Sequence, residues 1–287
     1  MEHKQITANG INLHVVQDGS STGRFVILLH GFPEFWYSWR RQIPHLAAAG
    51  YRVWAPDQRG YNLSEKPDGI APYTLDELAA DVIGLMDAAG QEKAFLVGHD
   101  WGAAVAWRVA AKYPERLARM VAINVPHGTV MLENLRRNPR QMLKSWYMFF
   151  YQLPWLPETL ARLRDWRAPA KLMRLCSRLG TFTDEDLDAY RQAWSQPKAY
   201  TSMINWYRAL MQKPSPPMAN PRITVPTLLI LGTQDRFLVR EMAQPSIDLC
   251  DDGRLVFFEE ATHWVHHEEA DRVNELIDTF LSGDSMS

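Results

Sequence analysis

The stretch 96-LVGHDWGAAVAWRVA-110 decides the fold of this chain. An apolar run ends at Gly98, Asp100 follows it, and Gly102 begins a series of small and apolar residues at helical spacing. This order is typical of a sharp turn from a buried strand into a helix, because glycine permits the close backbone approach that such a turn needs. The layout is that of a nucleophile elbow, with a carboxylate at its apex where a serine would usually stand.

Short apolar runs alternate with helical patterns on both sides of this elbow. The strand-like runs are 24-RFVILLHG-31, 51-YRVWAPD-57, 93-KAFLVGHD-100 and 117-LARMVAINVP-126, and helices are expected over 36–48 and 75–89. The segment 11-INLHVVQDG-19 alternates apolar and polar residues, which is typical of a half-exposed antiparallel strand. The alternation predicts an α/β fold with a mostly parallel sheet and helices on both faces.

The strand pattern stops between residues 128 and 220, where tryptophans, arginines and leucines recur at helical spacing and aromatic residues and prolines are abundant. It returns with 225-VPTLLILGTQD-235 and 254-RLVFFEEA-261, and a last helix is expected to end near residue 281. We therefore expect an α/β core domain made of residues 1–127 and 221–287. A helical cap domain over residues 128–220 would be inserted after the sixth strand.

Composition excludes several classes of function. The 287 residues carry a formal charge of −2 without a long basic run, which argues against a nucleic-acid partner. No apolar run approaches the roughly 20 residues of a membrane span, and the N-terminus lacks a signal-peptide pattern, so a cytoplasmic protein is expected. Cys176 and Cys250 are read as reduced thiols. Neither metal-ligand spacing nor a phosphate-binding glycine loop is present, so no metal and no cofactor are expected.

Asp100 is expected to be ionised, because it stands beside a helix N-terminus whose amides favour negative charge. The loop 30-HGFPE-34 follows a predicted strand, and loops at this place donate one backbone N–H to an oxyanion. The two donors would be the amides of Phe32 and Trp101, and the Phe32–Pro33 bond could be cis. The alternative is that Asp100 only caps the helix.

An acid and a histidine follow Asp100 in the order that such sites use. Asp235 comes just after one predicted strand and His263 just after the last one. His266 and His267 are rivals of His263, but we expect them to be solvated on the last helix. The alternative is a helix-capping role for Asp235 and a surface position for His263.

The chain resembles the epoxide hydrolases of the α/β-hydrolase fold. The resemblance spans nearly the whole length and is carried by the motifs HGFPE, DQRGYNLSEKP, GHDWGA, WYMFFYQLP, NWYR, GTQD and ATHW, in the order of the family. It implies an eight-stranded, mostly parallel sheet with an inserted cap domain. It also implies an enzyme that converts a small hydrophobic epoxide and water into a vicinal diol.

The chemistry of this family explains why a carboxylate stands at the apex of the elbow. An ionised Asp100 needs no base to attack a saturated carbon, and its attack would form an alkyl ester. His263, oriented by Asp235, would then activate water to attack the ester carbonyl, with Phe32 and Trp101 holding the oxyanion. The resemblance also makes Trp264 a candidate for substrate binding.

The resemblance assigns acid or hydrogen-bond donor roles to two tyrosines of the cap. They are Tyr147 in WYMFFYQLP and Tyr207 in NWYR, whose phenols stay protonated at neutral pH. Tyr151 is expected to line or pack the site, whereas Tyr190 and Tyr200 match no catalytic pattern. For Tyr147 and Tyr207 the alternative is simple packing in the cap core. Asp57 and Arg59 of DQRGYNLSEKP are expected to be structural.

Two other functions stay open at this stage. A haloalkane dehalogenase shares the fold and the aspartate nucleophile, and Trp101 could donate to a halide, although Phe32 stands where those enzymes place asparagine. In fluoroacetate dehalogenases arginines follow the nucleophile closely, whereas here the next one is Arg108. The second alternative is a non-catalytic receptor that keeps the pocket. The sequence leaves the oligomeric state open, with a homodimer as one outcome.

Overall fold

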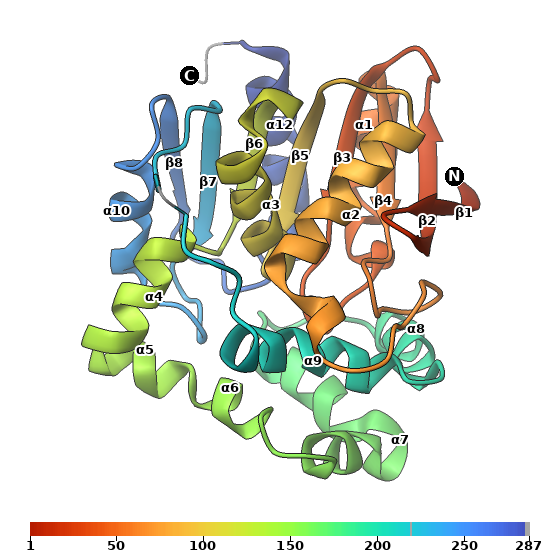
Figure 1. The fold of residues 1–287 in the computed structure, drawn as a ribbon, viewed down its shortest axis with the longest axis vertical. Coiled ribbons are helices and arrows are strands. Elements are labelled where there is room, and N and C mark those ends of the chain that lie inside the picture. The colour runs from red at the N-terminus through yellow and green to blue at the C-terminus, as the bar shows by residue number, and fades with distance from the viewer. Residues whose placement is uncertain (219, 285–287) are drawn as a thin grey trace.

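The computed structural model describes residues 1–218 and 220–284. One eight-stranded sheet runs through the molecule in the order β1-β2-β4-β3-β5-β6-β7-β8 (Figure 1). Its strands are β1 (Glu2–Ala8), β2 (Ile11–Gly19), β3 (Arg24–Leu29), β4 (Tyr51–Pro56), β5 (Ala94–His99), β6 (Leu117–Ile123), β7 (Thr227–Gly232) and β8 (Gly253–Phe258). β2 pairs antiparallel with both β1 and β4, and the other five strand pairs are parallel. The predicted mostly parallel sheet is confirmed.

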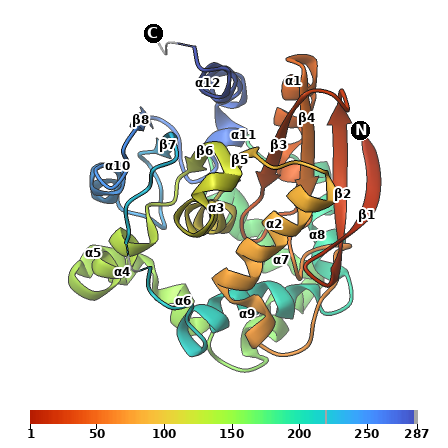
Figure 2. The same ribbon diagram turned by 45° about the horizontal axis from the view of Figure 1, so that its top comes forward.

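Helices cover both faces of this sheet (Figure 2). On one face lie α1 (Gln42–Ala48) and α12 (Ala270–Ser282), and on the other lie α2 (Leu75–Ala88) and α3 (Trp101–Lys112). Successive residues of β3 therefore enter different cores: Val26 packs in the core under α1, and Ile27 in the core under α2. Burial on both faces is why the parallel strands read as continuous apolar runs in the sequence.

The remaining elements of the core domain are short. They are η1 (Trp36–Trp39), η2 (Ala71–Tyr73), η3 (Pro114–Arg116), η4 (Arg240–Met242), α10 (Ala243–Ile247) and α11 (Val265–Glu268). The single helix expected over 36–48 is thus wrong, because η1 and α1 are separate. The reason is Pro44, which would clash with the carbonyl four residues earlier in a continuous helix, but fits the first turn of α1.

Six helices lie between β6 and β7 along the chain. They are α4 (Gly128–Arg137), α5 (Pro139–Lys144), α6 (Trp146–Phe150), α7 (Leu156–Leu175), α8 (Asp184–Ser195) and α9 (Ala199–Gln212). They gather on the side of the molecule where the parallel strands end (Figure 1). We propose that they form the cap domain, whose expected start coincides with the first residue of α4. The expected segment also includes residue 219, which lies outside the described residues.

Hydrogen bonds from two tryptophans join the cap helices to loops at the carboxyl end of the sheet. The Trp194 indole of α8 donates to the Pro33 carbonyl at 2.6 Å, and the Trp206 indole of α9 donates to the Arg59 carbonyl at 3.0 Å. Arg40 adds an ion pair with Asp186 at 2.9 Å. The cap is therefore held directly over the loops that follow the strands.

Two further expectations concern single features. Cys176 and Cys250 are free thiols, as the sequence predicts, and both are buried. Within the described residues, no helix combines the length and apolar character needed to cross a membrane.

Candidate active site

Asp100 forms the apex of the turn between β5 and α3. Its backbone has φ 49° and ψ −120°, a region that costs free energy for any residue with a side chain. The flanking glycines make the turn possible: a Cβ on Gly98 would collide with the backbone of Gly102, and one on Gly102 with the Leu29 carbonyl. The local sequence therefore forces the Asp100 side chain out above the end of the sheet.

Three residues that the sequence singled out meet at this apex. The His263 Nε2 atom lies 3.4 Å from Asp100 Oδ2, and its Nδ1 atom lies 2.7 Å from Asp235 Oδ2. Asp235 follows β7 and His263 follows β8, so neighbouring parallel strands deliver them to the same edge. The geometry is that of a histidine held between two carboxylates.

The charges of this group stabilise one another. Burial lowers the pKa of His263, but the charge of Asp235 and the hydrogen bond to Asp100 outweigh burial and hold the pKa well above 6.5. Burial raises the pKa of Asp100, but the hydrogen bond and charge of His263 bring it below its usual value. Burial likewise raises the pKa of Asp235, but the charge of His263 outweighs burial and brings this pKa below its usual value. In the resting protein, the group is therefore an imidazolium between two carboxylates.

The backbone amide of Phe32 donates to Asp100 Oδ1 at 2.8 Å. This amide lies in the HGFPE loop, whose Phe32–Pro33 bond is cis. Trp101, the other expected oxyanion donor, is the first residue of α3, and its ring centroid lies 5.0 Å from that of Tyr207. The loop after β3 and the start of α3 thus enclose the carboxylate from two sides.

Tyr147 of α6 and Tyr207 of α9 lie together above this carboxylate. Their ring centroids are 5.8 Å apart, and the Tyr207 ring also meets Phe32 at 5.2 Å. Burial raises the pKa of both phenols well above 10, and the negative charge of Asp100 raises it further. Both hydroxyls therefore remain protonated and able to donate.

The other cap tyrosines lie where the sequence reading put them. Tyr151 packs against Tyr207 at 5.0 Å and Phe32 at 5.4 Å, so it lines the same space. The Tyr190 hydroxyl instead donates to Glu34, away from Asp100. Tyr200 contacts Phe32 from further off, at 6.1 Å.

Trp264 is buried next to the histidine of the site. Its ring centroid lies 5.2 Å from that of His263 and 5.4 Å from that of Phe182 in the cap. These contacts support packing of the His263 loop. A direct contact of Trp264 with substrate stays a prediction.

The expectation that His266 and His267 are solvated is wrong, since their exposed fractions are 0% and 4%. The His267 Nε2 atom donates to Glu34 at 2.7 Å, and the His266 ring packs 4.9 Å from Trp39. The buried Glu34 carboxylate needs hydrogen-bond donors, which accounts for the inward position of the His267 ring. The His266 ring is buried by packing, and neither of its nitrogens has a hydrogen-bond partner among the described residues. Burial raises the pKa of Glu34, but the charge of His267 outweighs this and holds it well below the usual value.

Sequence reasoning missed Asn124, which positions Asp235. Its amide nitrogen donates to Asp235 Oδ2 at 2.8 Å, while its carbonyl oxygen accepts from Gly232 N–H at 3.1 Å. The residue has φ 64°, a conformation that asparagine tolerates better than most residues. The available signal was an asparagine directly after a buried strand.

Glu34 and His99 form a second group that the sequence did not reveal. His99 joins Glu34 through Nδ1 at 3.0 Å and donates through Nε2 to the backbone carbonyl of His263 at 2.8 Å. With His266 these two residues place three ligand atoms within 4.8 Å of one another, which is metal-like spacing. The Glu34 oxygens already accept hydrogen bonds from His99, His267 and Tyr190, so the group is a hydrogen-bond network.

Asp57 and Arg59 make structural contacts, as expected. Asp57 accepts from the Trp36 amide at 3.0 Å and contacts His14 at 2.6 Å, and Arg59 pairs with Asp81 through two nitrogens. These bonds fix the loop whose Arg59 carbonyl receives the cap indole described above. The loop therefore supports the cap rather than the reacting groups.

Comparisons with known proteins identify the family of this chain. The family described as the alpha/beta hydrolase fold matches residues 24–270. The AB hydrolase superfamily protein YfhM of Bacillus subtilis is 48% identical over 281 residues, covering 96% of both proteins. Human Epoxide hydrolase 4 is 40% identical over 96% of this chain and 77% of its own length. The crystal structure of the Bacillus megaterium epoxide hydrolase with an inhibitor superposes with a TM-score of 0.89, at 30% identity, over 97% of this chain and all of the other.

Proposed function

This chain belongs to the alpha/beta hydrolase fold family and, within it, to the epoxide hydrolases, and on that premise we propose that Asp100 is the nucleophile that opens the epoxide. The observation that carries the proposal is the position of the Asp100 carboxylate. One of its oxygens is held by the Phe32 amide, the other lies 3.4 Å from His263, and two buried phenols stand above it.

In the first step, an Asp100 oxygen attacks an epoxide carbon and the carbon–oxygen bond of the ring breaks. The ring oxygen takes up negative charge, which hydrogen bonds from Tyr147 and Tyr207 stabilise, and a phenol proton is transferred to it. The product is an ester between Asp100 and the substrate. The raised pKa of both phenols matches this role, since they are protonated before the attack.

In the second step, water hydrolyses this ester. Esterification removes the charge of Asp100, one of the two carboxylates that raise the pKa of His263, so the imidazole loses its proton more readily. That proton restores the phenol that protonated the ring oxygen. The neutral imidazole then takes a proton from water, which attacks the ester carbonyl of Asp100. The amides of Phe32 and Trp101 stabilise the oxyanion until the diol leaves. The bond between the acyl carbon and the ester oxygen breaks, so in one turnover Asp100 supplies one diol oxygen and the epoxide supplies the other. The water oxygen replaces the oxygen that Asp100 gave up, so water is the net source over repeated turnovers.

The substrate class follows from the residues around the carboxylate. Phe32, Trp101, Tyr151 and Phe237 surround it with aromatic rings. Such walls suit small hydrophobic epoxides, with polar contacts confined to the reacting end. Water is the second substrate, and the proposed reaction uses no cofactor.

The deciding experiment is intact-protein mass spectrometry of a His263→Gln variant incubated with epoxides and, separately, with haloalkanes. Without its base, the variant accumulates the ester, so the mass should rise by one whole epoxide on the peptide that contains Asp100. The matched control is the Asp100→Asn/His263→Gln double variant, which should gain no mass.

The other outcomes identify the alternative functions. A mass gain of an alkyl group without its halogen would identify a dehalogenase. Binding of epoxides by the wild type without any adduct or turnover would identify a receptor. An adduct that persists in the double variant would exclude Asp100 as the nucleophile.

A further inference from the structure

The outer side of the cap carries an unusual concentration of exposed apolar side chains. Of the 16 large hydrophobic residues that are exposed in the described part of the chain, 12 lie between Met142 and Leu179. Trp155 is 77% exposed and Leu179 is fully exposed. Isolated exposed leucines are ordinary, but a cluster of this size marks an interaction surface.

The same segment is strongly basic. Seven lysines and arginines but only two acidic residues lie between Met142 and Leu179, although the whole chain has a formal charge of −2. One of the two acids, Glu158, is buried and paired with Arg208 at 2.7 Å. Positive charge and exposed apolar surface are therefore combined on one part of the cap.

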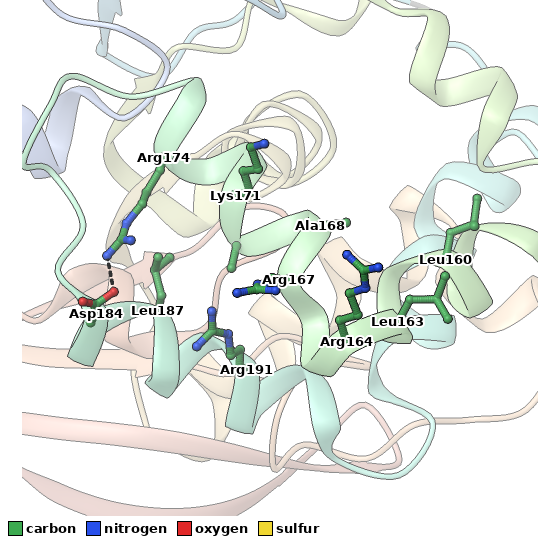
Figure 3. Close-up of a pocket in the computed structure, with 11 residues that line it drawn as sticks. Leu160, Leu163, Arg164, Arg167, Ala168, Lys171, Arg174, Asp184, Leu187 and Arg191 are labelled. Atoms are coloured by element: carbon green, nitrogen blue, oxygen red, sulfur yellow. Dashed lines mark hydrogen bonds and ion pairs between the residues drawn. The ribbon is translucent and has the colours of Figure 1, made fainter.

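Both features meet in a hollow of about 880 Å³ between α7 and α8, which we call the cap groove (Figure 3). It is lined by Leu160, Leu163, Arg164, Arg167, Ala168, Ala170, Lys171, Arg174, Asp184, Leu187 and Arg191. Asp184 neutralises Arg174 at 2.6 Å, and Asp188 neutralises Arg191. Among the described residues, Arg164, Arg167 and Lys171 have no such ion pair, so three free cations stand beside the leucines.

A kink in α7 places these groups side by side. The backbone of Arg164, Asp165 and Trp166 has positive φ values of 52° to 58°, which divides α7 into two helical segments. The indole of Trp166 is buried and donates to Ser195 of α8 at 2.6 Å, so the kink is anchored to the neighbouring helix. Leu163 and Arg164 are therefore presented at the kink to the same groove.

We propose that the cap groove and the exposed leucines of α7 bind the surface of a membrane that contains anionic lipids. Exposed leucine and tryptophan together with lysine and arginine are the composition of helices that lie in the membrane interface. Lipid phosphates would neutralise Arg164, Arg167 and Lys171, and acyl chains would accept Leu160 and Leu163. Binding at the membrane surface in this way does not require a membrane-spanning helix.

The positive charge of the cap groove argues against a second copy of the chain as its binding partner. A twofold interface would bring the same groove from both copies face to face, and the three free cations of each would repel those of the other. An acidic soluble protein would satisfy the cations. It would need fixed pockets for exposed leucines that are spread along the chain from Leu156 to Leu179, whereas fluid acyl chains adapt to any arrangement of them.

The test is co-sedimentation of the full chain with vesicles of phosphatidylcholine alone or with about 30% phosphatidylglycerol. We expect binding only to the anionic vesicles, and a marked loss between about 0.1 M and 0.5 M salt as screening increases. The groove variant Arg164→Gln/Arg167→Gln/Lys171→Gln should bind on the order of 100-fold more weakly, at about fivefold per cation.

The matched control removes the same charge elsewhere. Arg136, Arg137 and Arg140 on α4 and α5 are exposed, and Arg136→Gln/Arg137→Gln/Arg140→Gln should bind like the wild type. Equal losses in both triple variants would show attraction by net charge and overturn the groove. Absence of binding to either vesicle would overturn the proposal, and a dimer that the groove variant abolishes would assign the groove to a second copy. Sedimentation measures no turnover, so this result is independent of the proposed function.

Discussion

At the scale of single residues, the two carboxylates that flank His263 differ in how far their side chains are exposed to solvent. The side chain of Asp100 is 17% exposed, whereas that of Asp235 is 2% exposed and is enclosed by Asn124 and backbone amides. A nucleophile must reach its substrate, and an orienting carboxylate must stay fixed. In the proposed mechanism, the same carboxylate group would therefore serve two different roles because the surroundings differ.

The paired phenols give the first prediction at this scale. Tyr147→Phe and Tyr207→Phe should each slow ring opening on the order of 100-fold, because one hydrogen bond to the developing alkoxide is lost. Single-turnover ester formation followed by rapid quenching measures this step. Tyr113→Phe, in a half-buried tyrosine remote from the site, is the control and should leave the rate unchanged. Equal rates in all three variants would remove both tyrosines from the mechanism.

The raised pKa of His263 predicts how stability depends on pH. Its folded-state pKa lies well above the 6.5 of the ordinary histidine. The ion pairs therefore stabilise the protein fully below pH 6.5, and this contribution disappears as the pH rises through the folded-state pKa. Over that window, the wild type should lose up to about 1.4 kcal/mol of unfolding free energy per pH unit more than His263→Gln. Urea unfolding of both proteins from pH 6 upward measures the difference, and parallel curves would contradict the charged pair.

At the scale of elements, the elbow depends on two glycines that let α3 approach β3 and β5. Gly102 lies so close to the Leu29 carbonyl that an added Cβ has no room. Side chains cannot move aside here, since the obstacle is backbone. The sharp turn and the close packing of α3 on the sheet therefore both depend on the absence of a side chain at Gly102.

This constraint predicts opposite outcomes for two glycine-to-alanine changes. Gly102→Ala should lower the unfolding free energy by several kcal/mol, because β3 and α3 must separate. Gly128→Ala, at the first residue of α4 where nothing lies within 4 Å of the new Cβ, should be neutral or stabilise by up to about 1 kcal/mol. Thermal and urea unfolding compare the two. A well-tolerated Gly102→Ala would mean that the elbow has more room than this geometry allows.

At the scale of the whole molecule, the cap contributes to the site in two ways. It brings Tyr147 and Tyr207 above Asp100, and it supports the HGFPE loop through the Trp194 indole at the Pro33 carbonyl. The amide that holds Asp100 belongs to the preceding residue, Phe32. We therefore expect the position of the cap to affect the placement of the Phe32 amide, the proposed oxyanion donor.

A pair of matched tryptophan variants tests this coupling. Trp194→Phe and Trp166→Phe each remove one indole hydrogen bond of 2.6 Å, but only the first joins the cap to the core. Both should cost about 1–3 kcal/mol of unfolding free energy. Only Trp194→Phe should also lower kcat for epoxide hydrolysis. Equal kcat values in both variants would show that the Pro33 bond is purely structural.

Features that depend on neighbouring residues were predictable from the sequence. The elbow and the alternation of strands and helices follow from local backbone preferences and from burial. These patterns also place Asp100, Asp235 and His263 directly after strands, in the chain order that such sites use. Local patterns were misleading where a long-range partner decided the outcome. His267 looks like a solvated residue of a terminal helix, but it is buried and hydrogen-bonded to the carboxylate of Glu34, more than 200 positions earlier.

The sequence by itself therefore determined the α/β fold and placed its chemical groups at the ends of particular strands. Only the tertiary structure decided which groups meet: Asn124 with Asp235, Glu34 with His99, and the two cap tyrosines with each other. The physical reason is that backbone conformation is set by nearby residues, whereas a buried polar group must be satisfied by whichever donor the packing of distant segments supplies.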